Sequence, residues 1–294
     1  MRWHDGFIAV DWGTTNRRAY AIGADGRVAE RIEDDLGILS IANGGFVDEI
    51  GMLRTRFGDR PMLLAGMIGS NRGWIETPYV PCPARLADLV AGLVWVEKDR
   101  LAIVPGLSFE DGETADVMRG EEVQIFGAAG SGMVPAGSLV CHPGTHNKWI
   151  ALEGDMIAGF RTVMTGELFN LLKEHSILGE LLAMPARPDA AFERGVRHGL
   201  AHDDLTAALF SVRAGVLLGR RPREEAASHV SGLLIGSDLR IGLRADRAGE
   251  IAVIGSPDLT RLYAAALAHA LRATRQIDGD DAFVAGARMI AEQL

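Results

Sequence analysis

The strongest fold signal in the sequence lies at residues 7–18, which read FIAVDWGTTNRR. An apolar run ends at an aspartate, is broken by Gly-Thr-Thr at 13–15, and resumes as a strand-like pattern over 17–22. A further turn at 24–26 follows, so the region predicts a β-meander. Glycine in such a turn lets backbone N–H groups point at a phosphate oxygen, and the preceding aspartate suits Mg²⁺ held through water.

A second stretch of the same kind lies at residues 139–149, which read LVCHPGTHNKW. It has a strand, a turn at Gly144-Thr145 and another strand, and it carries Lys148, one of three lysines in the chain. No stretch fits the P-loop pattern, and no glycine-rich dinucleotide fingerprint opens a helix after the first strand. The two hairpins together predict two phosphate-binding turns, one at the start of each of two similar halves.

The remaining pattern alternates helices and strands, which predicts an α/β chain of two domains. Helical periodicity appears over 46–57 and 84–96, and another helix is expected over 223–234. Glycine-serine pairs at 236–237 and 255–256 are expected to form turns after apolar segments. Residues 112–120 are polar and loop-like, so we expect an N-terminal domain of residues 1–113 and a C-terminal domain of residues 114–294.

Composition limits the function classes. At 294 residues, with 48% hydrophobic residues and a net charge of −9, the chain is globular and acidic, which argues against a nucleic-acid partner. No apolar run is long enough to cross a membrane, and we expect no signal peptide, because the first residues lack a long apolar segment. Two cysteines without metal spacing favour a reducing cytoplasm. The oligomeric state, including a homo-oligomer, stays open.

These motifs resemble known proteins at two levels, a superfamily and a more specific family. Residues 8–15 resemble the first phosphate motif of the sugar kinase, actin and heat-shock chaperone superfamily, and Gly144-Thr145 stands where the second should fall. Strings over most of the chain resemble the 2-dehydro-3-deoxygalactonokinase family; they lie at residues 66–74, 118–122, 141–149 and 165–170.

The resemblance implies a fold, an activity and cofactors. The fold would be two actin-like (ribonuclease H-like) domains with an interdomain cleft, and the last helix, around 283–288, would pack back toward the N-terminal domain. The activity would be transfer of the ATP γ-phosphoryl group to the 6-hydroxyl of 2-dehydro-3-deoxy-D-galactonate, with Mg²⁺, in galactonate breakdown. ATP and the sugar acid would be the partners.

Roles for the phosphate-binding residues follow from the two motifs. Asp11 is expected to orient the water shell of Mg²⁺, and Lys148 to place a positive charge on the transferring group. The turn that resembles the adenosine loop is Gly255-Ser256. The residues expected to meet the β- and γ-phosphates are Gly13, Thr14, Thr15, Gly144 and Thr145.

A carboxylate is expected to accept the proton of the substrate hydroxyl. Many relatives in the superfamily carry an aspartate at a helix start shortly before the second phosphate turn, where this chain has Glu121 and Glu122 after a glycine. We choose Glu121, because the helix dipole stabilises an anion there. Glu122 and Asp116 remain alternatives.

A loop at residues 70–74 is the expected site for the acid substrate. Arg72 can make a bidentate contact with a carboxylate, and Trp74 can pack on the sugar chain. Ser70 and Asn71 belong to the same loop, and Arg161 is the alternative cation.

Two rival functions remain. Another carbohydrate kinase of the same fold that acts on a neutral sugar would not need Arg72. A phosphatase of the same fold would not need an acceptor sugar. A nucleotide-gated binding module like actin or the heat-shock chaperones would need large additional segments, for which 294 residues leave little room.

Overall fold

The computed structural model describes residues 3–42, 44–245 and 249–294 and divides the chain into two compact units. The first unit comprises Met1–Ala136, Glu153–Gly159 and Gly279–Leu294, and the second comprises Gly137–Leu152 and Phe160–Asp278. None of the helices in the described part of the chain is long and apolar enough to cross a membrane.

The first unit contains a six-stranded sheet with the order β3-β2-β1-β4-β7-β6. β1 to β3 form the antiparallel meander, and β4 and β7 continue the sheet parallel to β1. These strands are β1 (Gly6–Trp12), β2 (Arg17–Gly23), β3 (Val28–Asp34), β4 (Met62–Gly66), β6 (Val94–Glu97) and β7 (Leu101–Ile103).

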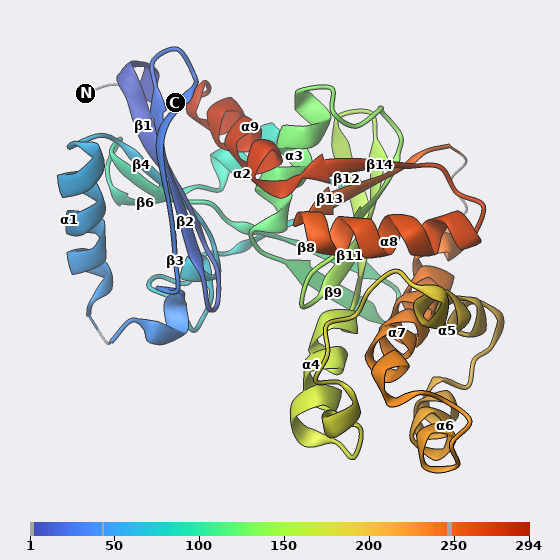
Figure 1. The fold of residues 1–294 in the computed structure, drawn as a ribbon. Coiled ribbons are helices and arrows are strands. Elements are labelled where there is room, and N and C mark those ends of the chain that lie inside the picture. Colours follow the sequence, from blue (N-terminus) through green and yellow to red (C-terminus); the bar gives the residue numbers. More distant parts are fainter. Residues whose placement is uncertain (1–2, 43, 246–248) are drawn as a thin grey trace. The chain divides into compact units, whose positions relative to one another are not determined.

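Helix α1 covers this sheet, because one apolar stripe faces it (Figure 1). Phe46, Ile50, Leu53 and Phe57 are buried against side chains of β1 and β4, which is the periodicity read from the sequence. The helices of this unit are α1 (Phe46–Phe57), α2 (Leu86–Ala91), α3 (Glu121–Gly130) and α9 (Gly279–Ala291).

Helices α3 and α9 cross at close range through glycines. A Cβ at Gly127 would lie 2.0 Å from the carbonyl oxygen of Ala282, and one at Gly286 would lie 2.0 Å from that of Val123. Small residues therefore let the two backbones approach, and the C-terminal helix belongs to the first unit.

A three-stranded sheet in the first unit corrects one expectation. The loop predicted over 112–120 contains β9, which pairs antiparallel with β8 across a turn at Gly112. The boundary expected after residue 113 falls inside this hairpin. The strands of this sheet, in the order β5-β8-β9, are β5 (Tyr79–Pro81), β8 (Gly106–Asp111) and β9 (Thr114–Met118).

The second unit repeats the sheet order of the first. Its sheet has five strands in the order β12-β11-β10-β13-β14, again with an antiparallel hairpin followed by parallel strands; only the end of β11 and the start of β12 fall in the segment Glu153–Gly159 of the first unit. This matches β3-β2-β1-β4-β7 strand for strand, and it gives the chain the duplicated α/β fold of actin-like proteins. The strands are β10 (Leu139–His142), β11 (Asn147–Glu153), β12 (Met156–Val163), β13 (Ile251–Gly255) and β14 (Thr274–Asp278).

The helices of the second unit correct two further expectations. The helix expected over 223–234 continues to Gly242, so Gly236-Ser237 is not a turn. Gly236 serves packing instead, since a Cβ there would lie 2.4 Å from the carbonyl oxygen of Val196 on α5. The helices are α4 (Thr165–His175), α5 (Ala190–Ala201), α6 (Leu205–Leu217), α7 (Ala226–Gly242) and α8 (Pro257–His269).

Short elements complete the chain. The helix expected over 84–96 is limited to α2, because the chain turns at Gly92 and then pairs as β6 with β7. Single-turn 3₁₀ helices lie at Trp3–Asp5, Ile38–Ser40, Met67–Gly69, Gly179–Leu181, Arg223–Glu225 and Leu243–Ala245.

Candidate active site

The first phosphate turn is braced from behind by a segment that the sequence did not single out. The carbonyl oxygens of Gly13 and Thr15 accept hydrogen bonds from the backbone N–H groups of Ile38 and Gly37, both at 3.0 Å. Gly37 must be glycine, because a Cβ would lie 2.3 Å from the carbonyl carbon of Thr15.

This bracing uses carbonyl groups of the turn and leaves its donors available. Thr14 and Thr15 are exposed, and their backbone N–H groups have no acceptor in the described part of the chain. Consecutive N–H groups in a turn form a concave site for an anion. The geometry therefore fits the phosphate role expected for Thr14 and Thr15, whereas the N–H of Gly13 donates to the carbonyl oxygen of Asn16 at 2.9 Å and closes the turn.

Asp11 lies at the end of β1 with a strongly perturbed carboxyl group. It is half-buried, opposite Arg18 in the sheet register and close to Gly66, where a Cβ would lie 3.3 Å from its Oδ1. Burial raises the pKa of Asp11 to about 6; Arg18 opposes this, and the charges of Asp280 and Glu121 add to it. A cation at this group would replace its proton.

Asp280 is a member of this charge cluster that sequence reasoning missed. It stands at the start of α9 and lies 2.6 Å from Nη1 of Arg31 and 3.7 Å from Nε of Arg18. Three acidic residues within four positions, at 278, 280 and 281, were the available sequence signal. Their contribution to the site required the fold of the first unit.

The three candidate bases differ in their surroundings. Glu121 begins α3, is half-buried, interacts electrostatically with Asp11, and accepts a hydrogen bond from the backbone N–H of Arg119 at 3.0 Å. Glu122 is fully buried; both its oxygens accept from the N–H of Gly120, and burial raises its pKa to about 8. Asp116 lies on β9, and its Oδ1 accepts from the N–H of Val117. Of the three, Glu121 carries the charge that acts on Asp11.

The second turn is held by the N-terminus of α4. The carbonyl oxygen of Thr145 accepts from the N–H of Glu167 at 2.9 Å, and a Cβ at Gly166 would lie 2.4 Å from the carbonyl oxygen of Gly144. The backbone N–H groups of Gly144 and Thr145, like those of the first turn, have no acceptor among the described residues.

Lys148 lies behind this turn. The side chain is 4% exposed, and Nζ donates to the carbonyl oxygen of His146 at 3.1 Å. His146 in turn contacts Glu167, with Nε2 2.5 Å from Oε2. The lysine is therefore next to the turn, as its spacing predicted, but most of its length is enclosed.

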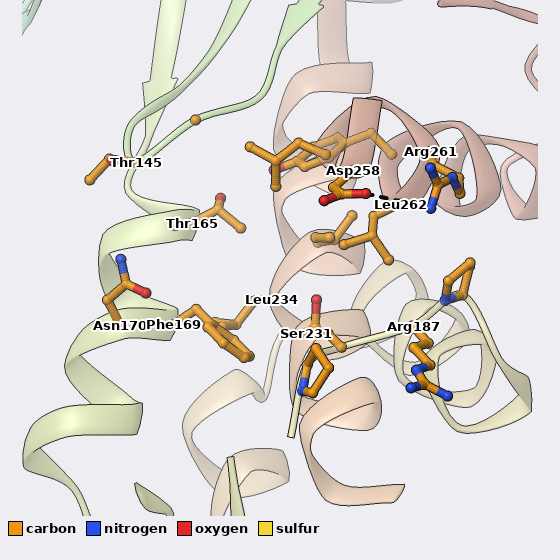
Figure 2. Close-up of a pocket in the computed structure, with 18 residues that line it drawn as sticks. Thr145, Thr165, Phe169, Asn170, Arg187, Ser231, Leu234, Asp258, Arg261 and Leu262 are labelled. Carbon is orange, nitrogen blue, oxygen red and sulfur yellow. Dashed lines mark ion pairs between the residues drawn. The ribbon is translucent and has the colours of Figure 1, made fainter. Parts of the chain in front are cut away.

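A cavity of about 510 Å³ opens beside the second turn, within the second unit. Figure 2 shows Phe169 and Asn170 on α4 along one wall, Ser231 and Leu234 on α7 below, and Leu262 and Arg261 on α8 above. Gly144, Thr145 and Thr165 line the end nearest the turn. A largely apolar cavity that ends at free N–H groups suits a flat heterocycle joined to a phosphate chain.

The turn at Gly255-Ser256, which is expected to contact adenosine, directly precedes the helix that lines this cavity. Gly255 lies near Pro143, at the base of the second turn, and Ser256 is the N-cap of α8. Neither lines the cavity, whereas Asp258, Leu259 and Leu262 of α8 do. The turn therefore sets where α8 starts, and the helix contributes the wall.

The loop expected to hold the acid substrate lies in the first unit. Ser70 is buried and donates to the carbonyl oxygen of Met67, while Trp74 stacks on Phe46 with ring centroids 6.2 Å apart. Asn71 and Arg72 are exposed, and the guanidinium of Arg72 has no ion-pair or hydrogen-bond partner within the described ranges. Arg72 is therefore available for a ligand, and Trp74 holds the loop on the core.

Arg161 is the alternative cation for the carboxylate of the acid substrate. Arg161 is exposed on β12, and in the described residues its guanidinium likewise has no ion pair.

No group of three or more His, Cys, Asp or Glu side chains is arranged to hold a metal directly in the part of the chain described. Mg²⁺ usually keeps several waters and binds through one or two carboxylates and substrate phosphates, so Asp11 is the residue that would hold it here.

Comparison with known proteins gives one consistent result. The family model described as 2-keto-3-deoxy-galactonokinase matches residues 11–290. The chain is 36% identical to 2-dehydro-3-deoxygalactonokinase of Escherichia coli (strain K12) over 289 residues, covering 97% of each chain. It is 38% identical over 292 residues to the probable 2-dehydro-3-deoxygalactonokinase DgoK1 of Rhizobium meliloti (strain 1021), covering 95% of this chain and 94% of that one.

A solved structure agrees with these sequence relatives. A crystal structure from Sinorhizobium meliloti, described as a candidate 2-dehydro-3-deoxygalactonokinase, superposes with a TM-score of 0.91 at 35% identity and covers 98% of both chains. The similarity therefore extends over both units and their connections.

Proposed function

This chain belongs to the 2-keto-3-deoxy-galactonokinase family, and from that premise we propose that it transfers the γ-phosphoryl group of ATP to the 6-hydroxyl of 2-dehydro-3-deoxy-D-galactonate. The observation that supports this best is the cavity of about 510 Å³ that ends at the free N–H groups of Gly144 and Thr145. Its apolar walls suit adenosine, and its end suits the phosphate chain.

In this mechanism the protein positions the reactants and compensates charge. The N–H groups of Thr14 and Thr15 and of Gly144-Thr145 bind phosphate oxygens, and Asp11 would orient the hydrated metal. Mg²⁺, when bound, neutralises charge on the polyphosphate. The 6-hydroxyl oxygen attacks the γ-phosphorus, its proton passes to Glu121, and ADP leaves.

The proposal also includes the residues that contact the substrate carboxylate and the cellular compartment of the protein. Arg72 contacts the carboxylate of the sugar acid, with Ser70, Asn71 and Trp74 shaping the loop, and Arg161 is the second candidate for this contact. Lys148 and the turn at Gly255-Ser256 support the second phosphate turn. The free thiols of Cys82 and Cys141 support a cytoplasmic location.

The test is an ADP-release assay with ATP, Mg²⁺ and a panel of 2-keto-3-deoxy sugar acids and neutral hexoses. We expect turnover with the galactonate-derived acid to exceed that with any hexose by at least about 10²-fold, because a hexose leaves the arginine unpaired. Greater turnover of a neutral hexose would replace the proposal with a hexose kinase. Phosphate release without any acceptor would replace it with a phosphatase.

A further inference from the structure

A buried carboxylate on α7 accepts hydrogen bonds from four side chains. Asp238 is 1% exposed, and its oxygens accept from Asn147 Nδ2 at 2.8 and 3.0 Å, Trp149 Nε1 at 2.6 Å, Thr165 Oγ1 at 2.6 Å and Tyr263 OH at 2.5 Å. None of these donors is a cation. Burial raises the pKa of Asp238, and the four hydrogen bonds oppose that change.

The donors come from three elements around the nucleotide cavity. Asn147 and Trp149 stand on β11, directly after the second phosphate turn, and Thr165 is the first residue of α4. Tyr263 comes from α8. One carboxylate therefore joins the strand that leaves the turn to two of the helices that wall the cavity.

The orientation of Asn147 is itself determined by a neighbour. The buried thiol of Cys141 donates to Asn147 Oδ1 at 3.5 Å, which directs the amide Nδ2 toward Asp238. Cys141 lies on β10, before the turn, so the strands on both sides of the turn enter the same network.

The α4 side of the network also reaches the turn. Thr165 precedes Gly166, which packs against Gly144, and Glu167, whose N–H donates to the carbonyl oxygen of Thr145. A shift of Thr165 would therefore also move Gly166 and Glu167. Their contacts engage the carbonyl oxygens of the turn, so the N–H groups of the turn stay without an acceptor among the described residues.

We propose that Asp238, which does not line the cavity, is a positioning residue that holds the second phosphate turn and the N-terminus of α4 in the arrangement that binds the polyphosphate of the nucleotide. The inference rests on the proposed function. Leu234 and Leu262, which would hold the nucleoside, lie outside this network; the network residues that also line the cavity are Thr165, at the end nearest the turn, and Tyr263 on α8. Because three of the four donors flank the turn, loss of Asp238 should weaken the phosphate contacts much more than the nucleoside contacts.

The test compares adenosine and ADP binding by calorimetry in the full chain. Asp238→Asn keeps the size of the side chain but replaces one acceptor oxygen with a donor. Thr165 and Tyr263 lose their acceptor when the amide nitrogen takes the place of Oδ2, and Trp149 loses its acceptor when it takes the place of Oδ1. We expect ADP affinity to fall by about tenfold or more and adenosine affinity by less than about threefold. The kcat for phosphoryl transfer should fall as well.

A matched variant separates positioning from general destabilisation. Leu239→Val shortens a fully buried side chain next to Asp238 on the same helix, outside the hydrogen-bond network. It should lower the melting temperature but leave the ratio of ADP to adenosine affinity unchanged. If Asp238→Asn does not fold, Asn147→Ala removes the two hydrogen bonds that this side chain makes to Asp238 and should give the same selective loss of ADP affinity.

The outcomes are distinct. Equal loss of adenosine and ADP affinity, or no loss of either, in Asp238→Asn would overturn the positioning role while leaving the proposed function intact. Failure of the wild-type protein to bind ADP would instead overturn the proposed function.

Discussion

At the scale of single residues, the carboxyl groups of the first unit have different surroundings and therefore different expected roles. Asp11 is half-buried with a pKa raised to about 6, and it shares a charge cluster with Arg18, Asp280 and Glu121. Glu122 is enclosed and bonded to a backbone N–H. The first group can exchange a proton for a metal ion, whereas the second is occupied in holding the start of α3.

Replacing Asp11 by Asn should cut kcat by about 10²-fold or more, because the orientation of the hydrated metal is lost. In the wild-type protein, the apparent affinity for Mg²⁺ should decline as the pH falls through about 6, since protons compete for Asp11. Steady-state kinetics with Mg²⁺ titrated at several pH values measures both effects. Wild-type turnover by a folded Asp11→Asn variant would remove this residue from the site.

Glu121→Gln should reduce kcat by about 10²–10⁴-fold while leaving ADP affinity nearly unchanged, because the amide keeps the shape of the side chain but cannot accept a proton. Glu122→Gln is the matched control, because Glu122 is 0% exposed and its hydrogen bonds run to the backbone. Its kcat should stay within about threefold of the wild type. The reverse result would identify Glu122 as the base, and two active variants would direct attention to Asp116.

At the scale of elements, the close crossing of α5 and α7 depends on glycines of α7, which have no side chain at the contact. Besides Gly236, Gly232 also faces α5, where a Cβ would lie 2.1 Å from the carbonyl oxygen of Phe192. The crossing supports α7, which provides both the cavity wall and Asp238. Its glycines thus contribute to the site without touching a ligand.

Gly236→Ala should destabilise the protein by more than about 2 kcal/mol, since the added methyl group would overlap backbone that cannot move independently. Gly215→Ala on α6 is the control: its Cβ would lie 3.5 Å from the nearest atom, which is ordinary contact. That change should stabilise the protein by about 0.5–1 kcal/mol through helix propensity. Urea unfolding of the two variants checks the opposite signs, and equal effects would contradict the packing role.

At the scale of the whole molecule, an acidic chain is proposed to bind anionic ligands. The net charge of −9 produces a long-range field that repels ATP and a sugar acid, and local donors such as the two phosphate turns must overcome it at short range. Affinity and encounter rate should therefore respond differently to salt.

The association rate of a fluorescent ADP analogue should rise about two- to threefold between roughly 20 and 150 mM salt, because salt screens the long-range repulsion. Stopped-flow fluorescence measures this rate, and the uncharged adenosine analogue serves as the control with no expected salt dependence. A rate that falls with salt would indicate that the arginines near the turns dominate the field at the site.

Features that depend on neighbouring residues could be predicted from the amino-acid sequence alone. The apolar runs and glycine turns at 7–22 and 139–152 were enough to predict both meanders, and the period of Phe46, Ile50, Leu53 and Phe57 was enough to place α1. The family motifs predicted the kinase family and the duplicated α/β fold, which the comparisons confirm. The roles of individual site residues stay predictions.

Features that join distant parts of the chain could be identified only in the folded structure. Gly236 resembled a turn residue until α5 was seen packed against it, and β9 resembled a loop until β8 was seen as its partner. Asp238 carried no local signal, because its partner Asn147 lies 91 residues away. Turn and helix signals arise from contacts within a few residues, whereas helix crossings, pocket walls and buried carboxylates depend on contacts that form only when the chain has folded.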